Sequence, residues 1–91
     1  MRRLIWSPDA LRDLMEIQRY IAEFNPGAAE RFFIRLKAAG DSLADFSERG
    51  RDSGRGRREH VLVKPYIIRY VVRGDEVRIM TIRHSARRPL R

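Results

Sequence analysis

Residues Arg57–Arg88, with the sequence RREHVLVKPYIIRYVVRGDEVRIMTIRHSARR, decide the fold of this chain. Three runs rich in β-branched and aromatic residues, Glu59–Val63, Tyr66–Arg73 and Glu76–His84, predict three strands. Gly74-Asp75 is a favoured two-residue hairpin turn between the second and third runs. The stretch therefore predicts an antiparallel meander that ends in a basic tail.

The hairpin turn also predicts a register, in which Arg73 faces Glu76, Tyr70 faces Ile79 and Ile68 faces Thr81. One face then carries no charge and is expected to pack on the core; its residues are Ile68, Tyr70, Val72, Val77, Ile79 and Thr81. The opposite face mixes apolar and basic side chains: Ile67, Arg69, Val71, Arg78, Met80, Ile82 and His84. Such a mixture is typical of a surface that a partner covers. The alternative is that the chain's own tail, residues 85–91, covers it.

The N-terminal half predicts a strand and a helical hairpin. Met1–Trp6 is a strand candidate, and Ser7-Pro8-Asp9 opens a helix with a capping residue and a proline. Asn25-Pro26-Gly27 ends that helix and opens a second one. Each helix has one apolar stripe, made of Ala10, Leu14, Ile17, Ile21 and Phe24 in the first and of Ala29, Phe32, Leu36, Ala39, Leu43 and Phe46 in the second. The prediction is one α+β domain over residues 1–91, ordered β-α-α-β-β-β.

Residues 47–58, SERGRDSGRGRR, have no apolar periodicity and contain three glycines and five arginines, which predicts a loop. The glycines do not form a phosphate-binding loop, because the Gly-Lys-Ser/Thr ending is missing and a strand follows instead of a helix.

Charge is distributed unevenly along the chain. Residues 1–48 carry seven Lys/Arg against eight Asp/Glu, whereas residues 49–91 carry 13 against four. Eighteen of the 20 cations are arginine, which binds carboxylates and phosphates through paired hydrogen bonds. The uneven charge predicts an acidic partner; the alternative is a solvated basic surface. The absence of cysteine and of a long apolar run predicts a cytoplasmic protein that does not span a membrane.

The order of elements and several phrases resemble the RelE/ParE superfamily of bacterial toxins. The phrases are Trp6-Ser7-Pro8 with Ala10 and Asp13-Leu14, Tyr20-Ile21-Ala22, Asn25-Pro26, Ala29 with Arg31-Phe32, Phe46 with Gly50-Arg51, Arg58-Glu59, Pro65-Tyr66-Ile67-Ile68 with Tyr70, and Ile82-Arg83-His84 with Ala86-Arg87. The resemblance implies a toxin neutralised by a cognate, ParD-like antitoxin, with operator DNA bound only through the antitoxin. On this basis we expect antitoxin contacts at Ile67, Arg69, Val71, Arg78, Met80 and Ile82, and neither a cofactor nor a metal.

The superfamily has two branches, and the resemblance implies a different chemistry for each. RelE-like members cleave mRNA on the ribosome, and Glu59, Arg69 and His84 are the candidate catalytic residues for that reaction. This chain has only two lysines, Lys37 and Lys64, and no tyrosine after His84, whereas many such nucleases carry a lysine cluster and a terminal aromatic residue.

ParE-like members poison DNA gyrase, and the tail of this chain resembles theirs more closely. The candidate target contacts are Arg83, His84, Arg87 and Arg88. In this branch the protein performs no covalent chemistry. A simple nucleic-acid-binding module ranks behind both branches, because neither helix has the pattern of a recognition helix.

Overall fold

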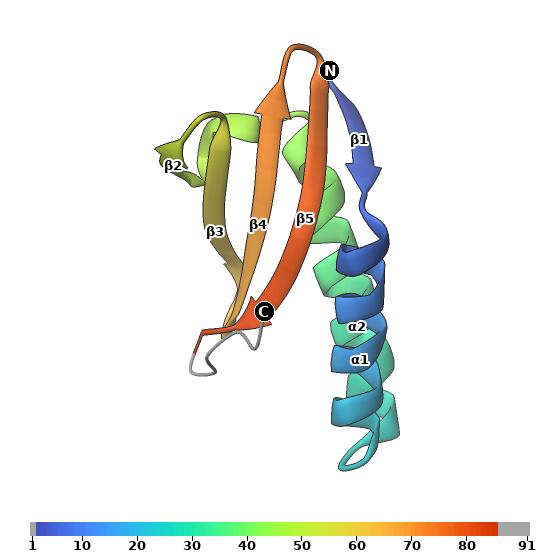
Figure 1. Cartoon of the computed structure of the whole chain (residues 1–91). Coiled ribbons are helices and arrows are strands. Elements are labelled where there is room, and N and C mark those ends of the chain that lie inside the picture. The colour runs from blue at the N-terminus through green and yellow to red at the C-terminus, as the bar shows by residue number, and fades with distance from the viewer. Residues whose placement is uncertain (1, 86–91) are drawn as a thin grey trace.

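The computed structural model describes residues 2–85, which form one strand, two helices and four further strands in that order (Figure 1). The bounds are β1 Arg3–Trp6, α1 Pro8–Ala22, α2 Pro26–Asp41, β2 Arg51–Gly54, β3 Arg57–Val63, β4 Tyr66–Arg73 and β5 Glu76–His84. Short 3₁₀ helices, Ser42–Ala44 and Ser47–Arg49, lie between α2 and β2. The predicted α+β class is confirmed, with β2 as an additional strand.

Both helices begin at the predicted capping residues. The Ser7 hydroxyl accepts a hydrogen bond from the Ala10 N–H at 3.0 Å, and the Asn25 side chain accepts one from the Ala28 N–H at 3.1 Å. A proline follows each cap, where its missing N–H costs no hydrogen bond. Only residues 23–25 separate the helices, and α1 and α2 therefore lie side by side as a hairpin (Figure 1).

The five strands form one sheet in the order β1-β5-β4-β3-β2. The β1 strand is parallel to β5, and every other pair is antiparallel. The core lies between one face of this sheet and the helix hairpin. Its buried apolar residues are Ala10, Leu14, Leu36, Leu43, Val63, Tyr66, Ile68, Tyr70, Val77, Ile79 and Ile82.

The helix stripes reach this core except at their C-terminal ends. Leu14 and Leu36 are fully buried, as predicted. Phe24 and Phe46 lie past the ends of α1 and α2 and are 74% and 53% exposed. Their assignment to the stripes was wrong, because the α-helical periodicity has ended before each of them. Leu43, which also follows α2, is fully buried in the first of the two 3₁₀ helices.

The prediction of a loop over residues 47–58 was also wrong in part. Arg51–Gly54 forms β2, which pairs with β3 through Arg51 opposite Glu59 and Asp52 opposite Arg58. All four residues of β2 are exposed and none has an apolar side chain, so the strand has no alternation of apolar and polar residues. Backbone pairing alone makes it a strand, and hydropathy could not predict it.

The predicted register of the β4–β5 hairpin holds from the turn to Tyr70 opposite Ile79 and is wrong beyond it. Met80 is an extra residue in β5, so Arg69 faces Thr81 and Ile68 faces Ile82. This β-bulge lies where the chain enters α1. There Ser7 donates from its N–H to the Ile79 carbonyl at 2.9 Å and from its hydroxyl to the Met80 carbonyl at 2.9 Å. The bulge exchanges the two faces for the rest of β5.

Within residues 2–85, no helix is long and apolar enough to cross a membrane.

Candidate partner-binding face

The helix hairpin packs on one side of the sheet, and we call the other side the outer face. Strand pairing places neighbouring side chains on it in rows across β3, β4, β5 and β1. Seven of its members are arginine and two are glutamate. Its residues are Arg3, Ile5, Arg51, Arg57, Glu59, Val61, Ile67, Arg69, Val71, Arg73, Glu76, Arg78, Thr81 and Arg83.

Each glutamate of the outer face lies between two arginines, which come from neighbouring strands for Glu59 and from β1 and β5 itself for Glu76. Glu59 Oε2 accepts a hydrogen bond from Arg69 Nε at 2.6 Å, and Glu59 Oε1 lies 3.9 Å from Arg51. Glu76 likewise accepts from Arg78 Nε at 3.2 Å and from Arg3 at 3.3 Å. The two ion-pair clusters hold these arginines over the sheet, and the arginine excess leaves the face strongly cationic.

The middle of the outer face is aliphatic. Ile67 and Val71 are half-buried between the arginines, and no described residue of this face is aromatic. Nucleic-acid sites commonly use aromatic side chains as platforms on which bases stack. An aliphatic surface with cations around it is more typical of a site for an acidic protein segment.

The structure brings together most, but not all, of the predicted antitoxin contacts. Ile67, Arg69, Val71 and Arg78 lie on the outer face. Ile82 does not, because the bulge turns it into the core, where it is 4% exposed. Met80 is the extra residue of the bulge and is 39% exposed. Thr81 and Arg83 take the outer-face positions that were assigned to Met80 and Ile82.

The residues proposed for acid–base chemistry lie on two different sides of the sheet. Glu59 and Arg69 are in contact on the outer face, but His84 lies opposite the buried Tyr66, with the two ring centroids 5.4 Å apart. The assignment of His84 to the outer face was wrong, again because of the bulge. Arg83 lies on the outer face, whereas Arg87 and Arg88 fall outside the described residues.

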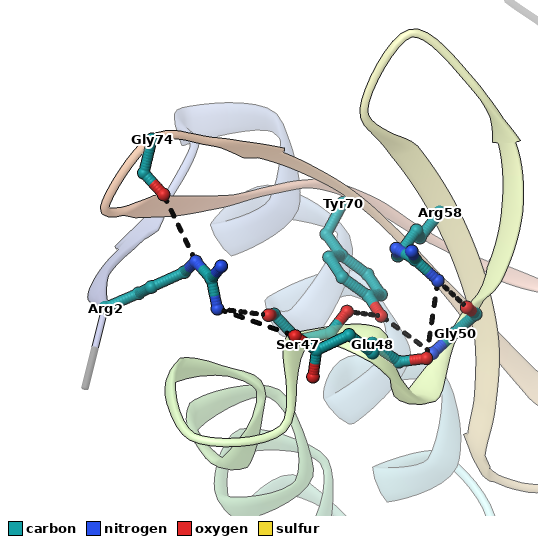
Figure 2. Close-up of polar contacts among 7 residues, drawn as sticks. All are labelled: Arg2, Ser47, Glu48, Gly50, Arg58, Tyr70 and Gly74. Carbon is teal, nitrogen blue, oxygen red and sulfur yellow. Dashed lines mark hydrogen bonds and ion pairs between the residues drawn. The ribbon is translucent and has the colours of Figure 1, made fainter.

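Sequence reasoning missed a buried network that fixes the loop before β2 (Figure 2). The Tyr70 hydroxyl donates to the Ser47 carbonyl at 2.8 Å and accepts from the Gly50 N–H at 2.8 Å. Arg58 donates to the Gly50 carbonyl at 2.7 Å. A β-carbon on Gly50 would lie 2.5 Å from the Tyr70 hydroxyl, so no larger residue fits there without movement. Burial raises the pKa of the Tyr70 hydroxyl above its ordinary value of 10.0.

A second anchor joins the same loop to the turn between β4 and β5 (Figure 2). Arg2 donates to the Ser47 hydroxyl at 2.7 Å and to the Gly74 carbonyl, in the β4–β5 turn, at 3.2 Å. These contacts place the segment that carries Arg49 and Arg51 beside β3. Nothing in the sequence pattern indicates them, because each joins residues far apart along the chain.

The other missed feature is an open cavity of about 490 Å³ beside β3. Its lining residues are Arg49, Arg51, Glu59, His60, Val61 and Ile67. Burial, and then the charge of Arg49, lower the pKa of His60 below its ordinary value of 6.5. His60 is therefore neutral near pH 7. The cluster of arginines in residues 47–58 was the one signal in the sequence that pointed here.

A short strand, a helix hairpin and a mainly antiparallel sheet with one arginine-rich face define a small basic toxin of the RelE/ParE superfamily. Residues 4–89 match the family model for the ParE toxin of the type II toxin-antitoxin system parDE. The chain belongs to this family and is thus a toxin of a type II toxin–antitoxin system.

Individual relatives agree with this assignment. Toxin RelE2 of Caulobacter vibrioides is 49% identical over 87 residues, which cover 96% of this chain and 99% of that protein. Toxin RelE3 of the same organism is 32% identical over 91 residues, covering 97% and 99%. A chain of the chromosomal ParDE TA system from P. aeruginosa has the same fold, with a TM-score of 0.81, 22% identity, and coverage of 92% of this chain and 96% of that one.

Proposed function

We propose that this toxin inhibits DNA gyrase by trapping the cleaved complex, and that a cognate, ParD-like antitoxin neutralises it by covering the outer face. The target proposal rests chiefly on the position of His84. Its ring contacts the buried Tyr66 on the side of the sheet opposite to Glu59 and Arg69. A proton donor and a proton acceptor must both reach the reacting atoms, so these three residues do not form a nuclease site. A gyrase target also implies a cytoplasmic protein.

Charge and surface chemistry support the antitoxin proposal. The outer face has an aliphatic middle and seven arginines, so an acidic segment gains both apolar contact and charge-assisted hydrogen bonds there. Arg69 and Arg78 are bound to glutamates through Nε. In this geometry their terminal nitrogens remain to contact a carboxylate of the partner.

The deciding experiment combines the purified toxin with gyrase, relaxed plasmid and ATP. We expect blocked supercoiling and an accumulation of cleaved DNA. The variant His84→Gln should inhibit gyrase as the parent does, provided that its thermal unfolding shows a folded protein. Normal supercoiling in the presence of the folded parent toxin would reject gyrase as the target.

The second candidate is ribosome-dependent cleavage of mRNA. Two features favour it: the ion-paired Glu59 and Arg69 on an arginine-rich face, and the likeness to Toxin RelE2. In that case Glu59→Gln should lower toxicity in cells strongly, because losing a positioned acid or base costs about 10²–10⁴-fold in rate. Cleavage of ribosome-bound mRNA, with gyrase unaffected, would replace the first proposal by this one.

A further inference from the structure

The sheet is incomplete at one corner of the outer face. The β2 strand pairs with β3 only as far as Arg51 opposite Glu59, whereas β3 continues to Val63. Past Glu59, the β3 backbone therefore has no β2 residue beside it. The cavity of about 490 Å³ lies at this corner. An exposed strand edge with a cavity next to it is the usual setting for an added strand.

The floor of the cavity is aliphatic. Ile67 is half-buried beneath it, and Val61 is 43% exposed although it lies in a strand. The bulge in β3 between His60 and Val63 interrupts its pairing with β4 at this point. One apolar side chain of a partner would cover both residues and remove them from water.

The rim of the cavity is cationic. Arg49 and Arg51 are exposed, and the carboxylate of Glu59 is held by Arg69 and Arg51. Arg83 lies across from Ile67, and its buried Nε has no hydrogen-bond partner among residues 2–85. His60 adds no charge near neutral pH, because its pKa is lowered. The rim thus has more positive than negative groups and favours a carboxylate.

We propose that this corner is the docking site for an extended, acidic segment of the antitoxin. The segment lies along the β3 edge past Glu59, sets an apolar side chain over Val61 and Ile67, and places a carboxylate between Arg49 and Arg51. This proposal rests on the proposed function, since it takes the antitoxin as the partner of the outer face.

The chemistry of the corner selects a peptide over other occupants. RNA would meet phosphate-binding arginines but no aromatic platform among the described outer-face residues. A second copy of this chain would bring another arginine-rich edge against Arg49 and Arg51, and like charges repel. An acidic peptide with alternating apolar residues can pair with the β3 backbone, contact the aliphatic floor and bind the arginines at the same time.

The test measures the affinity of the purified cognate antitoxin for three toxin variants by titration calorimetry. Val61→Lys places a charge on the aliphatic floor, and Arg51→Gln removes a rim cation whose side chain is 83% exposed. Each should weaken binding about tenfold or more. Leu11→Lys on α1 is the matched control, because Leu11 is 42% exposed and lies away from the outer face. It should bind as the parent does.

A second measurement reads the strand pairing directly. Amide hydrogen exchange along residues 60–62 should slow when the antitoxin binds, because an added strand would accept hydrogen bonds from those N–H groups that face away from β4. Unchanged exchange there, together with parental affinity of Val61→Lys and Arg51→Gln, would overturn the docking site. Protection of these amides by a single-stranded RNA octamer but not by the antitoxin would also overturn it.

The variant Arg78→Ala distinguishes docking at this corner from the proposal that the antitoxin covers the outer face. Arg78 is on the outer face, away from the cavity. If Arg78→Ala weakens antitoxin binding and the two cavity variants do not, the antitoxin covers the outer face without using this corner. If none of the three has an effect, the antitoxin does not bind the outer face, and both proposals fail.

Discussion

At the scale of single residues, Tyr70 holds the loop before β2 in place. The residue is 1% exposed, and its hydroxyl joins the carbonyl of Ser47 to the N–H of Gly50. Both groups belong to the segment that leads to Arg49 and Arg51. One buried hydroxyl thereby positions the rim of the cavity.

We predict that Tyr70→Phe destabilises the fold by about 1–3 kcal/mol, because it leaves a buried N–H and a buried carbonyl unpaired. Urea denaturation at pH 7.5 would measure the loss. Tyr20→Phe is the control, since Tyr20 is 45% exposed, and should change the stability little. Parental stability of Tyr70→Phe would mean that water replaces the two bonds.

Tyr70 also sets a pH dependence. Its pKa is raised in the folded state, so above the unfolded value of 10.0 the folded chain holds a proton that the unfolded chain has lost. This contribution to stability is complete below pH 10.0 and is lost as the pH rises through the folded pKa. Between pH 8 and pH 11, the free energy of unfolding should therefore fall more for the parent than for Tyr70→Phe. Parallel curves for the two proteins would contradict the buried position of the hydroxyl.

At the scale of elements, the local and periodic patterns in the sequence predicted both helices and the β4–β5 hairpin. Capping residues and apolar stripes located α1 and α2, and Gly74-Asp75 located the β4–β5 turn. The predicted strand pairing was wrong beyond Met80, because a turn determines the register only as far as the next β-bulge. One hint of the bulge was present in the sequence. Arg78 and Arg83 are five residues apart, and because side chains alternate along a strand, both can lie on one face only if a bulge separates them.

The outer face was likewise predictable only where the alternation of side chains along a strand is not interrupted by the bulge at Met80. Ile67, Arg69 and Val71 alternate along β4, which has no extra residue, and Arg78 precedes the bulge in β5, so their shared face was correctly predicted. Ile82 and His84 follow it and were misplaced. The cavity depends on β2 and on the Tyr70 network, which are held by backbone pairing and long-range hydrogen bonds. Neither leaves a periodic trace in the sequence.

Past the end of β1, the edge of β5 is covered by α1, and Asp13 of α1 binds the β5 backbone there. Its buried carboxylate accepts a hydrogen bond from the Ile82 N–H at 3.0 Å. We predict that Asp13→Ala lowers the free energy of unfolding by about 1–3 kcal/mol, as expected when a buried N–H loses its partner. Asp13→Asn, which keeps an acceptor oxygen, should retain more of that stability than the alanine variant.

Asp9→Ala serves as the comparison in the same urea titrations. Asp9 is exposed and, among residues 2–85, forms an ion pair with Arg12, one turn along α1. Exposed pairs contribute little, so this change should cost less than about 1 kcal/mol. Equal losses at positions 9 and 13 would show that the effect belongs to the helix and not to the edge of β5.

At the scale of the whole molecule, the segregation of charge has a kinetic consequence. Residues 49–91 carry all of the excess behind the net charge of +8, because residues 1–48 have one more acidic than basic residue, and the outer face presents much of it. Long-range attraction of this kind accelerates association and is screened by salt. We predict that the association rate constant with the antitoxin falls about tenfold or more between about 50 mM and 500 mM salt. Stopped-flow fluorescence would measure it, with the dissociation rate as the internal reference.

The position of β5 in the sheet determines when the toxin exists as a folded protein. The bond between Ser7 and Met80 spans 73 residues, which a ribosome making about 5–20 residues per second needs about 4–15 s to add. During those seconds β1 and the helix hairpin have been synthesised, but β5, the strand that pairs with β1 and contacts α1, has not. A partly made chain therefore leaves its apolar stripes uncovered. The folded toxin forms only after translation has passed β5, so the topology itself imposes a delay.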